Sequence, residues 1–178
     1  MNATFSSSKL AIASLFLTLW LGLLLPSLER SHLQNWDELW HACPAQSAVL
    51  EGHWWPLMLD GQAFFDKPPL MPWLVAVTVA ISGKPRAAWP YRIWNTVAGA
   101  LTLVSLIALG ALAGRFWGGL FAAALFGLQG DFVFHSRFFS MDTPFLGLSC
   151  LAALCMAWAL GEEHRKAAWT AAILKDVL

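Results

Sequence analysis

Charged side chains are scarce in this sequence. Asp, Glu, Lys and Arg make up 12% of the 178 residues, about half of the roughly 25% found in ordinary soluble domains. The formal net charge is +0, so the excess of positive charge that marks a nucleic-acid-binding protein is missing. The three cysteines, Cys43, Cys150 and Cys155, lack the spacing of a metal site. Packing explains the last two, because they lie in an apolar run.

Apolar and aromatic residues take the place of the charges. Hydrophobic residues make up 58% of the chain, and 11 residues are tryptophan. Because indole rings gather at membrane–water interfaces, this composition predicts an integral membrane protein. We therefore expect one all-α membrane domain with a polar loop over 29–68. The apolar segments are 10–28, 69–82, 93–112, 116–134 and 144–160.

The segment 10–28 is long enough to cross a bilayer, since about 20 helical residues span the hydrocarbon core. A cleaved signal peptide is the alternative reading. No small-residue cleavage site follows, however, because Pro26 leads into Leu28, Glu29 and Arg30. We favour a retained anchor with its N-terminus inside, which places the loop on the outer side.

Residues 35–72 form the longest polar stretch of the chain and combine acids, one lysine and several indoles. That mixture indicates a wet site at a membrane surface. Asn35 and Glu38 have the spacing of a capping box, which predicts a helix from Trp36 that lies in the interface. Pro44 should kink or split that helix, because proline removes a backbone hydrogen bond.

Some residues of this stretch have two readings. Asp37 and His41 are one helical turn apart and can touch, which suits a general base with an orienting partner. A solvated helix face is the alternative, and spacing alone favours it because exposed acids are the norm. Lys67, beside Pro68 and Pro69, is placed equally well to hold a lipid phosphate or to extend to water from a helix start.

A second polar group contains Asp131, His135, Arg137 and Asp142. Asp142 is explained by helix capping, since it precedes a Thr-Pro helix start. Capping does not explain His135 and Arg137 beside it. Because charged groups near membrane depth are costly, they tend to be functional.

Three stretches of the chain match a known pattern in order. They are Asp37-Glu38 with Glu51-Gly52-x-Trp54 and Asp60-Gly61-x-x-Phe64-Phe65-Asp66-Lys67-Pro68-Pro69-Leu70; Tyr91-Arg92-Ile93-Trp94-Asn95; and Arg137-Phe138-Phe139-Ser140-Met141-Asp142-Thr143-Pro144. Over about residues 10–165, they resemble polyprenol-phosphate-sugar-dependent glycosyltransferases. The relatives are the protein O-mannosyltransferase and lipid A aminoarabinose transferase superfamily. The resemblance implies the N-terminal transmembrane helices of a GT-C fold, with an extracytoplasmic loop that carries interfacial helices.

The resemblance also implies catalytic residues. Asp37 takes the general-base position, and Glu38 and Asp142 are the other catalytic acids. Asp66 falls where some relatives place an acidic metal ligand, which admits a divalent metal ion as cofactor.

Further residues are implied to bind the lipid-linked phosphate. Lys67 takes the position that grips this phosphate, and Arg137 is a candidate for a further phosphate or acid contact. Many relatives have Arg-Tyr after the Asp-Glu pair, where this chain has Trp40 and His41. Two alternatives follow: His41 replaces the tyrosine hydroxyl as a donor, or the site is impaired.

The implied reaction is transfer of a sugar from a polyprenyl-phosphate carrier to a lipid, glycan or protein acceptor. It takes place on the extracytoplasmic side of the cytoplasmic (inner) membrane. Because relatives have several hundred residues, we expect this chain to be the N-terminal part of such an enzyme, inactive alone and without the family's C-terminal part. A non-catalytic membrane scaffold or lipid-phosphate-binding remnant is the alternative, which Trp40, His41 and Pro44 support.

The implied mechanism constrains the topology. Lys67 and Asp142 must lie on one side of the membrane, so an even number of crossings separates them. The segment 69–82 is the shortest of the three between them, at about 21 Å of helix against a hydrocarbon core of about 30 Å. We therefore expect this segment to be partly immersed, while 93–112 and 116–134 cross.

Overall fold

The computed structural model describes the backbone of residues 6–30, 32–33 and 36–177, and the side chains of these residues apart from Trp36, Asp37 and 162–177. The elements are α1 (Ser7–Leu24), the 3-10 helix η1 (Leu25–Ser27), α2 (Trp36–Leu50), β1 (Met58–Leu59), β2 (Gln62–Ala63), α3 (Leu70–Ser82), α4 (Trp89–Leu112), α5 (Phe116–Leu128), α6 (Gly130–Ser136) and α7 (Asp142–Val177). Within this part of the chain the only sheet is the short β1–β2 pair. The all-α fold predicted from the sequence is therefore confirmed.

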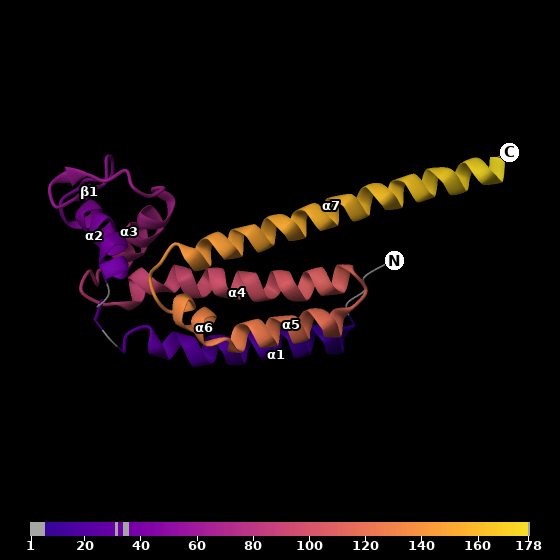
Figure 1. Ribbon diagram of the computed structural model, residues 1–178, viewed down its shortest axis with the longest axis horizontal. Helices are drawn as coiled ribbons and strands as arrows, with labels where there is room; N and C mark the ends of the chain where they lie inside the picture. Colours follow the sequence, from indigo (N-terminus) through magenta and orange to yellow (C-terminus); the bar gives the residue numbers. More distant parts are fainter. Residues whose placement is uncertain (1–5, 31, 34–35, 178) are drawn as a thin grey trace.

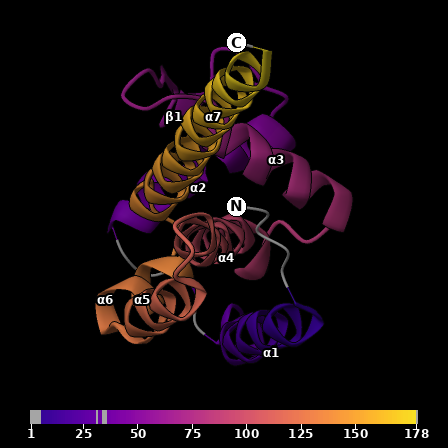
Figure 2. The same ribbon diagram turned by 90° about the vertical axis from the view of Figure 1, so that its right-hand side faces the viewer.

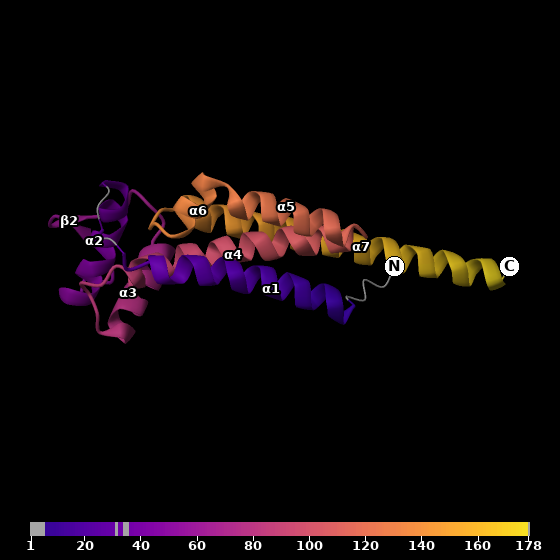
Figure 3. The same cartoon turned by 90° about the horizontal axis from the view of Figure 1, so that it is seen from below.

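The molecule has two parts (Figure 1). The helices α1, α4 and α5 and the first part of α7 run side by side as a bundle, an arrangement that Figure 3 shows from below. The elements α2, β1, β2 and α3 gather at one end of this bundle. We call this second part, residues 36–82, the loop lobe.

The helix α4 is the centre of the bundle, since it contacts α1, α3, α5, α6 and α7. Close helix contacts occur where small residues meet. A Cβ atom added to Gly119 of α5 would lie 2.9 Å from the Cα of Gly110 in α4, and one added to Gly147 of α7 would lie 2.7 Å from the carbonyl oxygen of Ala98. Such residues let helix backbones approach in a membrane, where apolar burial alone does not hold helices together.

Among the described residues, three helices are long and apolar enough to cross a membrane: Ser7–Ser27, Trp89–Leu112 and Asp142–Gly161. The bent pair α5–α6 is a fourth candidate if it forms one span. Their outward faces carry large apolar side chains, among them Leu23 at 74% exposure on α1 and Phe145 at 75% on α7. Exposure of such apolar faces is unfavourable in water and favourable in the hydrocarbon core of a membrane.

The segment 116–134, which the sequence predicts as one span, is divided. The helix α5 ends at Leu128 and α6 begins at Gly130, and the two are bent by 75°. Gln129 between them has extended backbone angles, with ψ at 129°. The expectation of one unbroken helix is thus corrected, and the glycines on both sides of the break are the physical reason, since they disfavour helix continuation.

The break and the end of α6 leave backbone carbonyl groups without a helical partner, and side chains of other helices donate hydrogen bonds to them. The Nε1 of Trp20 in α1 donates to the carbonyl of Gly127 at 2.9 Å. The hydroxyl of Thr96 in α4 donates to the carbonyl of Ser136 at 2.7 Å. Since an unpaired polar group is costly away from water, these bonds allow a helix break at the membrane.

The loop lobe begins with α2, which continues through Pro44 without a break. The expected split is therefore wrong. Proline removes only the hydrogen bond to the carbonyl four residues earlier, and the apolar face of α2, including Ala42, Ala45 and Ala48, is held in the core of the lobe. The hairpin β1–β2 follows, with positive φ angles at Asp60 and Gly61, as the Asp-Gly turn of a two-residue hairpin requires.

The helix α3 lies across the end of the bundle. Figure 2 looks along the bundle and shows α4 end-on while α3 extends sideways. The indole Nε1 of Trp94 in α4 donates to the Thr78 hydroxyl at 2.8 Å and to the Leu74 carbonyl at 3.2 Å, which ties α3 to α4. Only α4 and the bent α5–α6 pair run along the bundle between Lys67 and Asp142, so these two residues lie at the same end.

A pair of glycines tests the packing of α4 on α5. A Cβ at Gly119 meets α4 backbone at 2.9–3.0 Å, whereas a Cβ at Gly118 meets only the Arg115 side chain at 3.7 Å. We expect Gly119→Ala to lower the unfolding temperature of the detergent-solubilised protein, because the helices must separate. Gly118→Ala should leave it unchanged or raise it, since alanine favours helix. Equal effects of the two variants would contradict this packing.

Candidate functional site

The residues singled out by the sequence gather at the end of the bundle that carries the loop lobe. The first turn of α2 carries Asp37 and Glu38, and Lys67 precedes α3. Arg137 follows α6, and Asp142 is the first residue of α7. The fold thus brings together polar groups from distant parts of the chain. The backbone of Asp37 belongs to α2, and its side chain lies outside the described residues.

Glu38 forms a buried ion pair with Arg92 of α4. The Nε of Arg92 lies 2.6 Å from one carboxylate oxygen and Nη2 lies 2.8 Å from the other. Glu38 is fully buried and Arg92 is 3% exposed. Such a two-point pair is strong and fixes orientation as well as distance. Both carboxylate oxygens are engaged by Arg92, so Glu38 joins α2 to α4. The catalytic role expected for Glu38 from the sequence stays a prediction.

The guanidinium of Arg92 also binds backbone carbonyls at the end of the first spanning helix. Nη1 donates to the carbonyl of Leu28 at 2.8 Å, and Nη2 donates to that of His32 at 3.2 Å. The carboxylate of Glu29 caps α4 nearby, since it accepts from the backbone N–H groups of Ala88 at 3.1 Å and Trp89 at 3.0 Å. Arg92 therefore joins the chain before the loop lobe to α2 and α4.

The loop between α6 and α7 is bound to the same centre. The backbone N–H of Phe139 donates to Glu38 Oε1 at 3.2 Å. Asn95 of α4, fully buried, donates through Nδ2 to the carbonyls of Ser140 at 2.9 Å and His135 at 3.3 Å. Sequence reasoning gave Asn95 no role of its own. The sequence feature that could have identified Asn95 is an amide side chain one turn after Arg92 in an apolar helix, where a polar side chain needs hydrogen-bond partners.

His41 lies in the core of this region, at 1% exposure, with its ring 5.7 Å from that of Phe139. The sequence predicts His41 as a donor toward substrate. In the structure its ring packs against the second loop, away from solvent, so it takes part in joining α2 to that loop.

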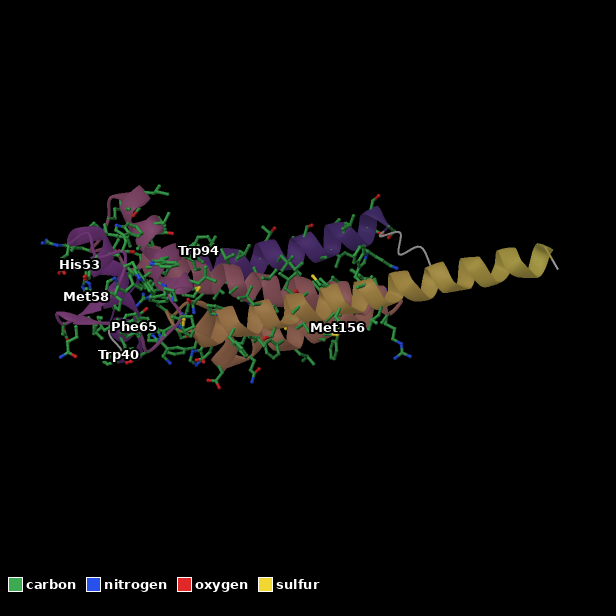
Figure 4. The ribbon with its side chains drawn as sticks, turned by 90° about the horizontal axis from the view of Figure 1, so that it is seen from above. Trp40, His53, Met58, Phe65, Trp94 and Met156 are labelled. Carbon is green, nitrogen blue, oxygen red and sulfur yellow. The ribbon has the colours of Figure 1, made fainter. Side chains whose placement is uncertain are left out.

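Lys67 lies on the wall of an open pocket of about 340 Å³. The pocket is lined by Trp55, Phe64, Phe65, Asp66, Lys67, Pro68 and Pro69. The ring of Trp55 meets that of Phe65 edge to face at 5.9 Å. Figure 4 labels Phe65 among the side chains of the loop lobe. Rings, prolines, one cation and one carboxylate give this pocket both apolar walls and polar contacts.

The acidic side chain of Asp142 is open to solvent at the start of α7. One carboxylate oxygen lies 3.9 Å from Nδ1 of His135, and the Asp142 side chain is 77% exposed. Arg137 is exposed in the same loop. Both side chains are thus free to meet a ligand that approaches this end of the molecule.

A metal centre has little support in the part of the chain whose side chains are described. No three His, Cys, Asp or Glu side chains gather there in a way that would hold a metal ion. Asp66 stays the residue that the resemblance offers as a metal ligand. A divalent metal ion stays a prediction, and we derive no step through one.

A second pocket of about 280 Å³ lies between α2 and the hairpin, lined in part by Cys43, Ser47, Glu51 and Asp60. Burial, and then the negative charge of Asp60, raises the pKa of the Cys43 thiol. This cysteine is therefore a weak nucleophile at neutral pH, because the thiolate is the reactive form.

The Glu38–Arg92 pair can be tested by a double-mutant cycle. Glu38→Leu leaves a buried guanidinium without its carboxylate, which costs about 3–5 kcal/mol. Arg92→Met leaves the buried Glu38 carboxylate without its guanidinium partner. We expect the double variant Glu38→Leu/Arg92→Met to lose much less stability than the sum of the single changes, measured by thermal unfolding in detergent. Glu51→Ala removes an exposed partner of His53 and is the control, with little expected change. Additive losses would contradict a coupled pair.

Comparison with known proteins agrees with this architecture. The sequence profile of the dolichyl-phosphate-mannose-protein mannosyltransferase family matches residues 66–174, more than half of the chain. The match begins at Asp66 and Lys67 and includes the polar start of α4 and the loop before α7. No curated protein and no solved structure matches the chain. The family has a membrane fold of the GT-C type, so the predicted superfamily and fold class are confirmed. The chain belongs to the dolichyl-phosphate-mannose-protein mannosyltransferase family of membrane glycosyltransferases.

Proposed function

We propose that this protein transfers a sugar from a polyprenyl-phosphate carrier to a lipid, glycan or protein acceptor on the extracytoplasmic side of the cytoplasmic membrane. The observation that carries the proposal is the Lys67 pocket. It combines a cation, a carboxylate and apolar walls at the same end of the bundle as Asp142 and the start of α2.

The pocket suits a lipid-linked sugar phosphate in each of its parts. Lys67 offers a point charge for the phosphate, and Asp66 offers acceptors for sugar hydroxyl groups. Trp55 and Phe65 offer apolar faces for the sugar ring or the first prenyl units. A soluble nucleotide sugar would not need so apolar a wall, which favours a lipid carrier.

The reaction requires a base and a stabilised leaving group. In the proposed mechanism the acceptor hydroxyl attacks the sugar C1 while Asp37 takes its proton. The bond between C1 and the phosphate oxygen breaks, and the polyprenyl phosphate leaves with a second negative charge. Lys67 interacts more strongly with this dianion than with the singly charged donor, so it lowers the barrier as well as binding the substrate.

The second loop supplies further proposed contacts. Arg137 is placed to bind the phosphate or an acidic group, and Asp142 to accept hydroxyl groups of the donor or acceptor. Support comes from their exposure and from the hydrogen bonds that hold their loop to Glu38 and Asn95. These bonds give the loop a fixed position, which a site needs for productive geometry.

A non-catalytic phosphate-binding scaffold is the second candidate. It is favoured by the burial of His41, which stands where many relatives have a tyrosine hydroxyl donor. A scaffold would bind the carrier through Lys67 and perform no transfer, so the two candidates differ in a measurable step.

Lys67 is tested by measuring the affinity of the protein in nanodiscs for undecaprenyl phosphate. We expect Lys67→Ala to weaken binding about 10- to 100-fold, since a hydrogen bond to a charged group contributes roughly 1.5–3 kcal/mol. Lys84→Ala, which removes another exposed cation of this end, is the matched control and should bind normally. Equal affinity of the Lys67→Ala variant and the wild type would remove Lys67 from the site.

Asp37 is tested in the full-length context, with the family's C-terminal part present, by transfer of mannose from a polyprenyl-phosphate mannose donor. We expect Asp37→Asn to abolish transfer and to leave the affinity for undecaprenyl phosphate within about twofold, because the base acts on the acceptor proton. Wild-type turnover in this variant would remove the base assignment. Lys67-dependent binding without transfer by the wild type would support the scaffold.

A further inference from the structure

His135 belongs to the second polar group of the chain and has no part in the mechanism proposed above. It lies in the last turn of α6, and its side chain is 38% exposed. The Nδ1 atom of the ring is nevertheless buried, and it has no hydrogen-bond partner among the described residues. Because an unpaired polar atom away from water is costly, this nitrogen calls for a partner that a small movement can supply.

The carboxylate of Asp142 is placed to be that partner. Among the described residues, Asp142 is the only acid with a carboxylate oxygen within 4.0 Å of His135. Its Oδ2 lies 3.9 Å from Nδ1, which is about 1 Å more than a hydrogen bond. The Asp142 side chain is 77% exposed, so it can turn toward the ring without displacing a packed neighbour.

Capping of α7 does not occupy the Asp142 carboxylate. A cap at this position accepts from the backbone N–H two or three residues on. Two residues on is Pro144, which has no N–H. The N–H of Phe145, three residues on, donates instead to the carbonyl of Met141 at 3.0 Å. The capping role that the sequence offers for Asp142 is therefore not what the structure shows, and its carboxylate is left for another partner.

The ring of His135 is the fixed member of the pair, because the end of α6 is bound to α4. Asn95 donates to the His135 carbonyl at 3.3 Å, and Thr96 donates to the Ser136 carbonyl at 2.7 Å. The ring also meets that of Phe134 edge to face at 5.2 Å. A bond from this ring would therefore hold the exposed carboxylate in a position that α4 defines.

The helix ends favour opposite charges on the two residues. A helix stabilises positive charge at its C-terminal end, where His135 lies in α6, and negative charge at its N-terminal end, where Asp142 lies in α7. Both end effects thus favour a donor at residue 135 and an ionised acceptor at residue 142.

The other charged groups of the elements packed against α6 leave this pairing open. The helix α6 contacts α4, α5 and α7. Arg92 of α4 is bound to Glu38, and α5 has no charged residue. Within α6, Asp131 is one helical turn before His135, but its carboxylate does not come within 4.0 Å of the ring in the described part of the chain. Asp131 is therefore a matched control for Asp142.

We propose that His135 is a positioning residue for Asp142. Its Nδ1–H donates a hydrogen bond to Oδ2, which fixes the carboxylate and leaves Oδ1 to accept from a hydroxyl group of the donor sugar. This inference deepens the proposed function and rests on it, since Arg137 is proposed there to bind the phosphate beside that sugar. A carboxylate that is already held loses less rotational freedom when the sugar binds, so the donor binds more tightly.

The hydrogen bond is tested by nitrogen-15 NMR of the full chain in nanodiscs, with the histidine rings labelled. At a pH where the ring is neutral, the spectrum shows which ring nitrogen carries the proton, and the His135 signals are those lost in His135→Asn. We expect the proton on Nδ1, because a neutral imidazole turns its N–H toward an acceptor. Asp142→Ala should shift it to Nε2, the tautomer that unbound histidine favours, and Asp131→Ala should leave it on Nδ1.

Two NMR results would overturn the proposal. One is a proton on Nε2 in the wild type, and the other is a proton that stays on Nδ1 in Asp142→Ala. Both spectra are recorded without substrate, so failure of the pairing and failure of the proposed function are distinguishable.

Two substitutions of His135 separate positioning from a structural role. His135→Asn places an amide N–H near the position of Nδ1, whereas His135→Gln places one near Nε2. In the full-length context we expect His135→Asn to keep the KM for a polyprenyl-phosphate mannose donor within about twofold, and His135→Gln to raise it about tenfold with a smaller change in kcat. Equal KM values in the two variants would contradict a role of Nδ1. Absence of transfer by the wild type would contradict the proposed function, and the NMR result then decides the pairing.

Discussion

The two-point ion pair between Glu38 and Arg92 is the interaction on which the arrangement of this end of the molecule depends. Its groups come from α2 and α4, and the same two side chains bind the chain after α1 and the loop before α7. Because both partners are buried, removal of either one leaves a charge in a region of low dielectric. The pair therefore makes the positions of separate segments interdependent.

A second constraint comes from the membrane, which leaves no backbone polar group unpaired without cost. The bend between α5 and α6 is compatible with this rule because Trp20, Asn95 and Thr96 take up carbonyls at the break and at the end of α6. The polar side chains of α4 thus have a structural purpose. They let the chain turn near the surface and present the second loop, with Arg137 and Asp142, toward the loop lobe.

The crosswise position of α3 connects these features to function. A crossing α3 would place Lys67 and Asp142 at opposite ends of the bundle, and no single site could contain both. Instead the residues proposed for donor binding lie with the second loop. The family assignment covers both regions, since the matching profile runs from Asp66 past Asp142.

The sequence by itself determined the all-α fold, the membrane class and the family, because low charge, long apolar runs and the Asp-Lys-Pro-Pro element are properties of the chain. The break at Gln129, the continuity of α2 through Pro44, and the burial of Glu38 and His41 were decided by the tertiary structure. Each depends on partners distant in sequence, such as Trp20 for the freed carbonyl and Arg92 for the carboxylate. In the sequence, Asp37 and Glu38 are two adjacent acids with nothing to distinguish them. Only the fold shows that Glu38 is buried against the guanidinium of Arg92.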